Sequence, residues 1–149
     1  MRAVLQRAKR AQVRVDGVVC GSIGKGLVVL IAIGREDGDE DINYMVSKIL
    51  NLRIFEDDQG KMNLSLRDIS GELLVVSQFT LYGDCRKGRR PNFFDAAPPD
   101  QALLMYRRFI DAIRKEGINP QEGEFQKMME LEIVNDGPVT ILLDSKKVF

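Results

Sequence analysis

The run Leu27–Ile33 constrains the fold more than any other segment of this chain. All seven residues are apolar, and six of them are valine, isoleucine or leucine. A strand with one face in water alternates apolar and polar residues, whereas a strand covered on both faces reads as a continuous apolar run. The run is also far shorter than the ~20 residues that span a membrane. It predicts a buried strand at the centre of a sheet.

Other strand patterns lie on both sides of this run. Asp16-Gly17 is a two-residue hairpin signal between two alternating segments, and Gly137-Pro138 separates two further strand-like runs. The first residues, Met1 to Arg7, also have a strand pattern. The remaining predicted strands cover residues 11–15, 18–23, 53–55, 73–79, 130–134 and 139–143.

Two segments have the period of a helix. The first begins at Asp39, and the second follows Pro99, with Asp100 as its predicted N-cap and Gly117 just past its end. The residues predicted to face inward are Ile42, Met45, Val46, Ile49 and Leu50 in the first helix and Leu103, Tyr106, Ile110 and Ile113 in the second. The sequence predicts a single mixed α/β (α+β) domain over residues 1–149, with mixed, largely antiparallel sheets and two main helices packed on one face.

Composition narrows the classes of function. Lys plus Arg and Asp plus Glu both number 22, so the net charge is zero. A neutral chain is not expected to bind DNA, and any contact with RNA needs a local basic patch. Cys20 and Cys85 lie far apart without metal-ligand spacing, as in reduced cytosolic thiols. We therefore expect a cytoplasmic protein with no membrane segment, no metal and no organic cofactor.

The chain contains no histidine. Its hydroxyl and thiol groups therefore have no imidazole to act as a base, which excludes the common nucleophile–His arrangements and His-bound zinc. The first candidate site is Ser77-Gln78-Phe79-Thr80, which places two hydroxyls and an amide at the end of an apolar strand. Taken singly, these hydroxyls are better explained as caps for free backbone groups than as part of a site.

Two further segments are candidates for contacts with a ligand. Gly137-Pro138 can present backbone carbonyls at a fixed angle, although alone it also reads as a turn or an edge bulge. Arg86, Lys87, Arg89 and Arg90 put four cations into five residues beside aromatic side chains. Such a run is often only a solvated loop, but beside a binding site it can hold the phosphates of an RNA end.

Several segments together resemble the D-aminoacyl-tRNA deacylase family. They occur in the order of that family, and the resemblance extends from Leu5-Gln6-Arg7 to the last strand. The matching segments are Arg53–Phe55, Gly60–Leu64, Ser77–Leu81, Lys87–Phe93 and Asn135–Thr140. The resemblance implies a homodimeric enzyme that hydrolyses the ester between a D-amino acid and the 3′ end of tRNA.

The resemblance also implies roles for individual residues. Gly137 and Pro138, joined by a cis bond, would enter the site of the partner subunit and act as a chirality filter. Ser77, Gln78, Phe79 and Thr80 would form the floor of the site. Phe125 and Met129 would line the pocket for the terminal adenosine, and Arg7 would steady the Gly-Pro loop.

Elementary chemistry suggests how such a site works without histidine. Backbone N–H groups around Phe79 and Thr80 can stabilise an oxyanion, and we expect the 2′-hydroxyl of the substrate to accept the proton. Thr80 as a covalent nucleophile is the rival mechanism. A filter that excludes by volume should admit glycine, so glycyl-tRNA, including glycine mischarged on alanine tRNA, is an expected substrate. A tRNA-end binder without turnover and a different small-ester or amide hydrolase are the alternative functions.

Overall fold

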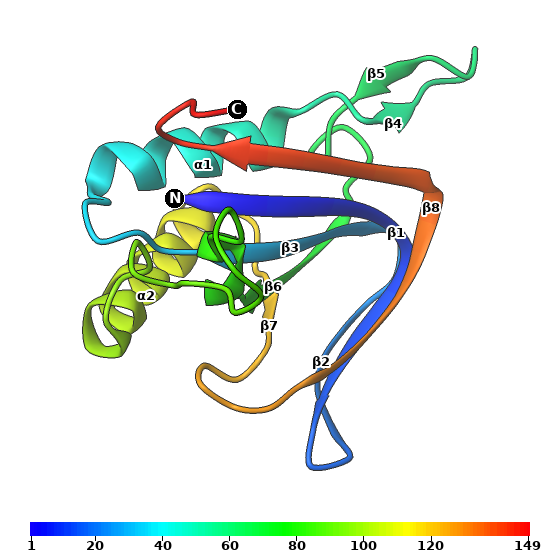
Figure 1. Cartoon of the computed structure of the whole chain (residues 1–149). Coiled ribbons are helices and arrows are strands. Elements are labelled where there is room, and N and C mark those ends of the chain that lie inside the picture. Colours follow the sequence, from blue (N-terminus) through cyan, green and yellow to red (C-terminus); the bar gives the residue numbers. More distant parts are fainter.

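In a computed structural model that describes residues 1–149, strand β3 lies inside a six-stranded sheet (Figure 1). The strands are β1 (Arg2–Val15), β2 (Val18–Ile23), β3 (Gly26–Ala32), β4 (Phe55–Glu56), β5 (Met62–Leu64), β6 (Glu72–Ser77), β7 (Gln121–Glu122) and β8 (Glu130–Asp144). The helices are α1 (Asp39–Asn51), the 3₁₀ helix η1 (Phe79–Tyr82) and α2 (Pro99–Lys115).

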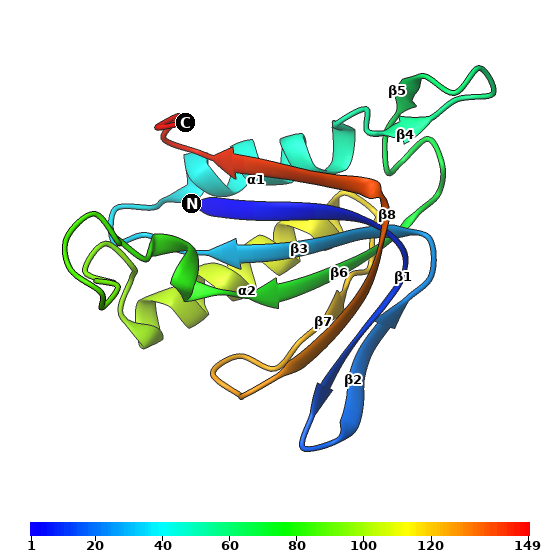
Figure 2. The same cartoon turned by 45° about the vertical axis from the view of Figure 1, so that its right-hand side comes forward.

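The main sheet has the order β2-β1-β3-β6-β7, and β8 pairs with β1 as well. Strand β1 is antiparallel to β2, β3 and β8, whereas β6 is parallel to both β3 and β7. Because β1 is long, its first half pairs with β3 and its second half with β2. Figure 2 shows that the second half of β1 and the first half of β8 curve away from the sheet together with β2. Strands β4 and β5 form a separate small hairpin.

Both faces of β3 are buried except at Leu30, which is half-buried, and this explains the continuous apolar run. Leu27, Val29 and Ile31 belong to the main core, on the face that α1 and α2 cover, while Val28 belongs to a second core beneath the curled strands. Residues 73–76 of β6 divide between the two cores in the same way. Parallel strands covered on both sides lose the alternation of polar residues.

The helices cover only one face of the sheet (Figure 1). On the other face, the N-terminal half of β1 and its neighbours present Val4, Leu30 and Leu142, and Leu142 is 59% exposed. Neither α1 nor α2 covers this part of the sheet in either view (Figures 1 and 2). The uncovered face is therefore apolar surface that the fold itself leaves in water.

Most of the sequence-based expectations agree with this architecture. The fold class is confirmed, as are the buried strand at 27–33, the hairpin turn at Asp16-Gly17 and the helix that begins at Asp39. Both turn residues have positive φ, at 50° and 78°, as a two-residue hairpin turn requires. No helix is both long and apolar enough to cross a bilayer.

Several element boundaries were predicted wrongly. Strand β6 ends at Ser77, because the chain turns into η1 at Phe79 instead of continuing. Helix α2 begins one residue before Asp100, and Pro98 is its N-cap; a proline at the first helical position costs no hydrogen bond. Leu103 is only half-buried, and Met105 and Phe109 fill the core instead. The short strand predicted at 53–55 is found at Phe55–Glu56.

The strands predicted at 130–134 and 139–143 form one continuous strand, β8. Gln6 pairs with Thr140 and Ala8 with Asn135, so that Arg7 alone lies opposite the four residues 136–139. The extra residues bulge out of the ladder, and the strand resumes its pairing on the far side. A proline fits here because a bulge needs no ladder hydrogen bond from it.

Candidate active site

A cavity with a volume of about 760 Å³ lies at the carboxyl ends of the parallel strands β3 and β6. This volume is within the ~300–1,000 Å³ of pockets for small ligands. The cavity is lined by Ile31, Ala32, Ile33, Val76, Ser77, Gln78, Phe79, Thr80, Phe93, Ala96, Ala97, Pro99, Ala102, Phe125, Gln126, Lys127, Met128, Met129 and Leu131. The strand ends, the start of α2 and the segment before β8 thus enclose a mostly apolar space with a few polar groups.

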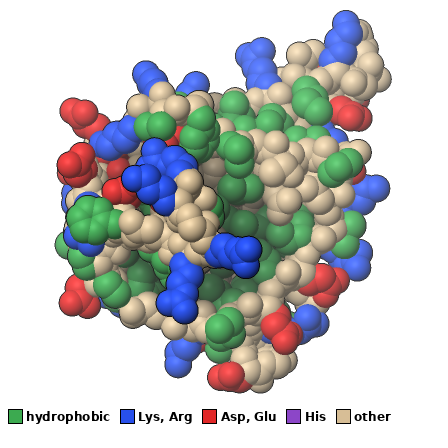
Figure 3. All heavy atoms as spheres, in the orientation of Figure 1, with side chains coloured by type: hydrophobic (Ala, Val, Ile, Leu, Met, Phe, Trp, Pro, Cys, Tyr) green, Lys and Arg blue, Asp and Glu red, His purple; other side chains and the backbone are tan.

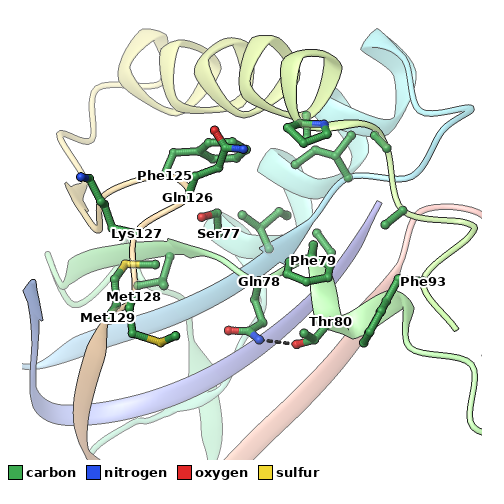
Figure 4. A pocket seen from close by; sticks show the side chains of 18 of the residues that line it. Ser77, Gln78, Phe79, Thr80, Phe93, Phe125, Gln126, Lys127, Met128 and Met129 are labelled. Atoms are coloured by element: carbon green, nitrogen blue, oxygen red, sulfur yellow. Dashed lines mark hydrogen bonds between the residues drawn. The ribbon is translucent and has the colours of Figure 1, made fainter. Parts of the chain in front are cut away.

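The structure brings Ser77, Gln78, Phe79 and Thr80 together on one side of this cavity. The backbone N–H of Gln78 donates to the carbonyl of Ile31 at 2.8 Å, which extends the pairing of β6 with β3 by one residue. The side-chain amide of Gln78 donates to the hydroxyl of Thr80 (Figure 4). The Ser77 hydroxyl makes no hydrogen bond within the protein, so it remains available to a ligand.

The backbone N–H groups of Phe79 and Thr80 donate to no loop carbonyl and to no side chain. They are the first residues of η1, where a helical N–H has no carbonyl before it to bind. If β6 continued to Phe79, as the sequence predicted, backbone N–H groups here could form hydrogen bonds to a neighbouring strand instead. The early end of β6 therefore leaves two backbone donors at residues that line the cavity.

The segment from Phe125 to Met129 lines the cavity opposite Phe79 and Thr80 (Figure 4). Phe125 packs against Tyr106 of α2, with ring centroids 5.8 Å apart. Gly123 approaches this segment so closely that an added Cβ would lie 2.6 Å from the sulfur of Met129. A flat aromatic ring and a polarisable thioether thus face a ligand on this side.

The sequence analysis gave no role to several residues of the cavity wall. Phe93 packs edge-on against Phe79 at 5.1 Å, and Pro99 and Ala102 line the wall because α2 begins there. Gln126, Lys127 and Met128 also line it. Phe93 lies in a segment that matches the family, but the others carry no signal in the sequence, since their position depends on how distant elements meet.

No acidic residue and no cysteine lines the cavity, and Lys127 is its single charged side chain. Near the cavity, Tyr106 and Asp84 have displaced pKa values, and both displacements are away from neutral pH. Burial, followed by the Glu122 carboxylate, raises the pKa of Tyr106, and hydrogen bonds from Arg86 hold the pKa of Asp84 below its usual range. Nowhere do three Cys, Asp or Glu side chains converge as a metal-binding group. The site therefore offers fixed donors and acceptors and no side-chain base poised near neutral pH.

Gly137 and Pro138 do not line this cavity. Both are exposed, and the peptide bond between them is cis, as the resemblance implies. The loop is closed by Asn135, whose side-chain carbonyl accepts the N–H of Val139 at 2.9 Å and whose amide donates to Thr140 at 3.2 Å. The loop thus projects from the bulge of β8 with its backbone accessible.

Arg7 lies buried directly behind this loop. Its Nε donates to the carbonyl of Asp136 at 3.0 Å, and its Nη1 donates to the carbonyl of Ile54 at 2.7 Å. The guanidinium also lies 3.5 Å from the carboxylate of Asp136 and 3.7 Å from that of Glu56. One side chain therefore ties the residue before Gly137 to the β4–β5 hairpin.

The basic residues of the 86–90 segment do not line the cavity. They differ in whether a carboxylate pairs with them. Arg86 is occupied by Asp84, to which its Nε and Nη2 donate at 2.8 Å and 2.7 Å. Lys87, Arg89 and Arg90 are exposed and form no salt bridge. Figure 3 shows Lys and Arg side chains gathered beside a hollow with an apolar floor.

Known proteins resemble this chain over nearly its whole length. The family model described as D-Tyr-tRNA(Tyr) deacylase matches residues 4–144. A D-aminoacyl-tRNA deacylase of Thermosipho africanus (strain TCF52B) is 58% identical over 149 residues, and one of Clostridium botulinum (strain Loch Maree / Type A3) is 59% identical over 149 residues. Both matches cover 100% of this chain and 100% of the relative.

Two solved structures share the fold. One, titled "c-Myc DNA Unwinding Element Binding Protein", superposes with a TM-score of 0.91 at 44% identity and covers 97% of this chain and 98% of its own. Another, of a probable eukaryotic D-amino acid tRNA deacylase, has a TM-score of 0.82 at 22% identity, covers 95% and 97% of the two chains, and is evidence for the fold alone. From the full-length sequence matches, the chain belongs to the D-Tyr-tRNA(Tyr) deacylase family, and it is an enzyme that removes D-amino acids from tRNA.

Proposed function

We propose that this deacylase binds the aminoacylated 3′ end of tRNA in the cavity beside η1 and judges the chirality of the amino acid with backbone atoms from a second subunit. The observation that carries the proposal is the pair of free N–H groups at Phe79 and Thr80 on the wall of a nucleoside-sized cavity. The terminal adenosine lies against Phe125 and Met129. The ester then faces Gln78 and Thr80 on the other side.

Ester hydrolysis needs a water molecule, a donor for the developing oxyanion and an acceptor for a proton. The N–H groups of Phe79 and Thr80 supply the donor function, and loss of one such donor typically costs ~10²–10³ in rate. The cavity wall contains no Asp, Glu or His that would accept the proton. We assign that step to the 2′-hydroxyl of the terminal ribose, which lies next to the ester in every aminoacyl-tRNA.

Thr80 positions groups in this mechanism and forms no covalent bond. Its hydroxyl accepts a hydrogen bond from Gln78, and no base contacts it. We expect Thr80→Ala to retain kcat within about five-fold of wild type, whereas loss of a true nucleophile costs about 10⁴ or more. The measurement is single-turnover hydrolysis of D-tyrosyl-tRNA, with a parallel substrate that ends in 2′-deoxyadenosine and is expected to be inert. An acyl-enzyme trapped on Thr80 would contradict the assignment.

The position of Gly137-Pro138 supports a homodimer. Met129 precedes β8 and Gly137 lies eight residues further along, about 25 Å at the rise of a strand. Since the loop does not line the cavity of its own chain, a loop that acts on the substrate has to come from a partner. The uncovered apolar face around Leu142 gives a second copy a surface on which to pack. We propose a homodimer in which each subunit completes the site of the other.

Backbone atoms suit a filter that must accept many side chains. The carbonyls of Gly137 and Pro138 bind the amino group of the substrate and occupy the space that an L side chain would need. A D side chain points away from them and meets no specific pocket. Arg7 supports the filter, because its hydrogen bonds to Asp136 and Ile54 hold the loop from behind.

The test of the proposed function compares three substrates in single-turnover assays. We expect hydrolysis of D-tyrosyl-tRNA, no hydrolysis of L-tyrosyl-tRNA above background, and hydrolysis of glycyl-tRNA, including glycine mischarged on alanine tRNA, because glycine has no side chain to clash. Binding of D-tyrosyl-tRNA without turnover would indicate a tRNA-end binder. Equal release from simple esters would indicate a general esterase. If glycyl-tRNA is not hydrolysed while D-tyrosyl-tRNA is, the filter does not act by excluding the volume of a side chain.

The proposal places the enzyme in the cytoplasm, where tRNA is charged. One structural relative is named for a DNA element that it binds. In this chain, a net charge of zero gives no general affinity for DNA, and the free cations of the 86–90 segment lie beside the cavity where an RNA end would enter.

A further inference from the structure

Phe94 is an exposed aromatic residue at the rim of the cavity. Its neighbours Phe93 and Ala96 line the cavity, whereas Phe94 points outward and is 67% exposed. An exposed phenylalanine forgoes burial that stabilises a fold by ~1.5–3 kcal/mol. Its packing within the chain therefore does not account for its position.

The structure nevertheless holds Phe94 in place. Its N–H donates to the side chain of Asn92 at 2.9 Å, and its carbonyl accepts the Nε of Arg35. The guanidinium of Arg35 covers one face of the ring, 4.7 Å from the centroid. Arg35 is itself fixed, since its carbonyl accepts the side chain of Gln101 at 2.9 Å and its N–H donates to Asp95 at 3.2 Å. One face of the ring is therefore supported and the other is open.

The surroundings of the ring favour an anionic ligand. Arg35 forms no salt bridge, and neither do Lys87, Arg89 and Arg90 in the loop that leads to Phe94. Arg35 and residues 84–95 together carry five cations and two carboxylates, Asp84 and Asp95. Asp84 is already neutralised by Arg86. A flat ring backed by a guanidinium, at the end of a loop that carries free cations, is a combination that suits single-stranded nucleic acid.

We propose that Arg35 and Phe94 form a stacking platform for the nucleotide that precedes the terminal adenosine in the single-stranded 3′ end of tRNA. The inference rests on the proposed function, because it takes the adenosine to lie in the cavity. The chain of the RNA then leaves across the rim that Phe94 occupies. The preceding base stacks on the open face of the ring, and Lys87, Arg89 and Arg90 approach the phosphates. The platform does not discriminate between bases, because every base has a flat face that can stack.

The experiment compares two substrates that differ only beyond the adenosine. D-Tyrosyl-tRNA reaches the platform, and 3′-O-D-tyrosyl-adenosine does not. We expect Phe94→Ala to lower kcat/KM for the tRNA by about five- to a hundred-fold through KM, the range that loss of one base stack produces. Hydrolysis of the adenosine ester should be unchanged, and Phe94→Trp should restore activity on the tRNA.

Leu104→Ala is the matched control, because Leu104 is 60% exposed on α2 and does not line the cavity. It should leave both substrates unaffected. An equal loss on both substrates with Phe94→Ala, or no loss on the tRNA, would overturn the platform. If the wild-type protein hydrolyses neither substrate, the proposed function fails instead.

A binding measurement tests the platform without catalysis. An RNA oligonucleotide with 2-aminopurine immediately before the terminal adenosine becomes less fluorescent when that base stacks on a ring. We expect quenching by the wild-type protein and by Leu104→Ala, and no quenching by Phe94→Ala at a concentration that saturates binding. Quenching that survives the loss of Phe94 would place the base elsewhere.

Discussion

Replacement of Gly26 by alanine should strongly destabilise the fold. A Cβ at this position would lie 1.8 Å from the carbonyl oxygen of Glu72 and 2.7 Å from its carbonyl carbon. Both atoms belong to the backbone of β6, which pairs with β3 at this point, so no side chain can move aside. Separating the two central strands should cost about 4 kcal/mol or more, a large part of a total stability of ~5–15 kcal/mol.

The measurement is urea unfolding followed by circular dichroism, with Gly24→Ala as the control. A Cβ at Gly24 would lie 3.4 Å from a carboxylate oxygen of Glu72, which belongs to an exposed and movable side chain. We expect the control to retain stability within about 1 kcal/mol of wild type. A Gly26→Ala protein equally close to wild type would show that β3 and β6 are less closely paired than the structure indicates.

Replacement of Gly137 by alanine should abolish deacylation of D-tyrosyl-tRNA while the protein stays folded. Gly137 has φ of +129°, where side chains are rarely accommodated, and a Cβ would lie 2.8 Å from the side chain of Val139 and 3.1 Å from Nη2 of Arg7. The loop must therefore shift, and a displacement of about 1 Å in a positioning group can cost 10²-fold. We expect kcat/KM to fall by about that factor or more.

The control is Gly38→Ala, since a Cβ there meets nothing within 4 Å. A mixing experiment then shows which subunit supplies the filter. Gly137→Ala and Gln78→Ala homodimers are each expected to be inactive, but a mixed dimer has one site with both parts intact. After subunit exchange we expect about one quarter of wild-type activity, as random pairing in a two-fold dimer predicts. No recovery would mean that the filter and cavity of one site belong to the same chain.

The fold was predictable where the local pattern and the tertiary environment agree. Strand β3 and helix α1 were found because burial on two faces, or on one helical face, leaves a clear periodicity. The end of β6 was missed by two residues, since Phe79 is apolar and suits a strand although it is exposed in η1. Strand β7 has only two residues and leaves no pattern at all.

The residues of the site were likewise predictable only in part. Ser77–Thr80, Phe125 and Met129 were expected to act together, and the structure brings them to one cavity. Pro99 and Ala102 were missed because they reach the wall only through the packing of α2 against the sheet. Likewise, the sequence marks Pro138 as a break between strands, but β1 pairs with β8 on both sides of it and keeps the strand continuous. Long-range pairing of this kind has no local signature.

The uncovered sheet face also has a thermodynamic consequence. A lone chain keeps Leu142 and its neighbours in water, and a second copy would remove that area from solvent. In the proposed homodimer, association and folding draw on the same apolar area, so we expect the denaturation midpoint to rise with protein concentration by mass action. Dilution alone would then destabilise the protein, and its heat tolerance would depend on the sample as much as on the polypeptide.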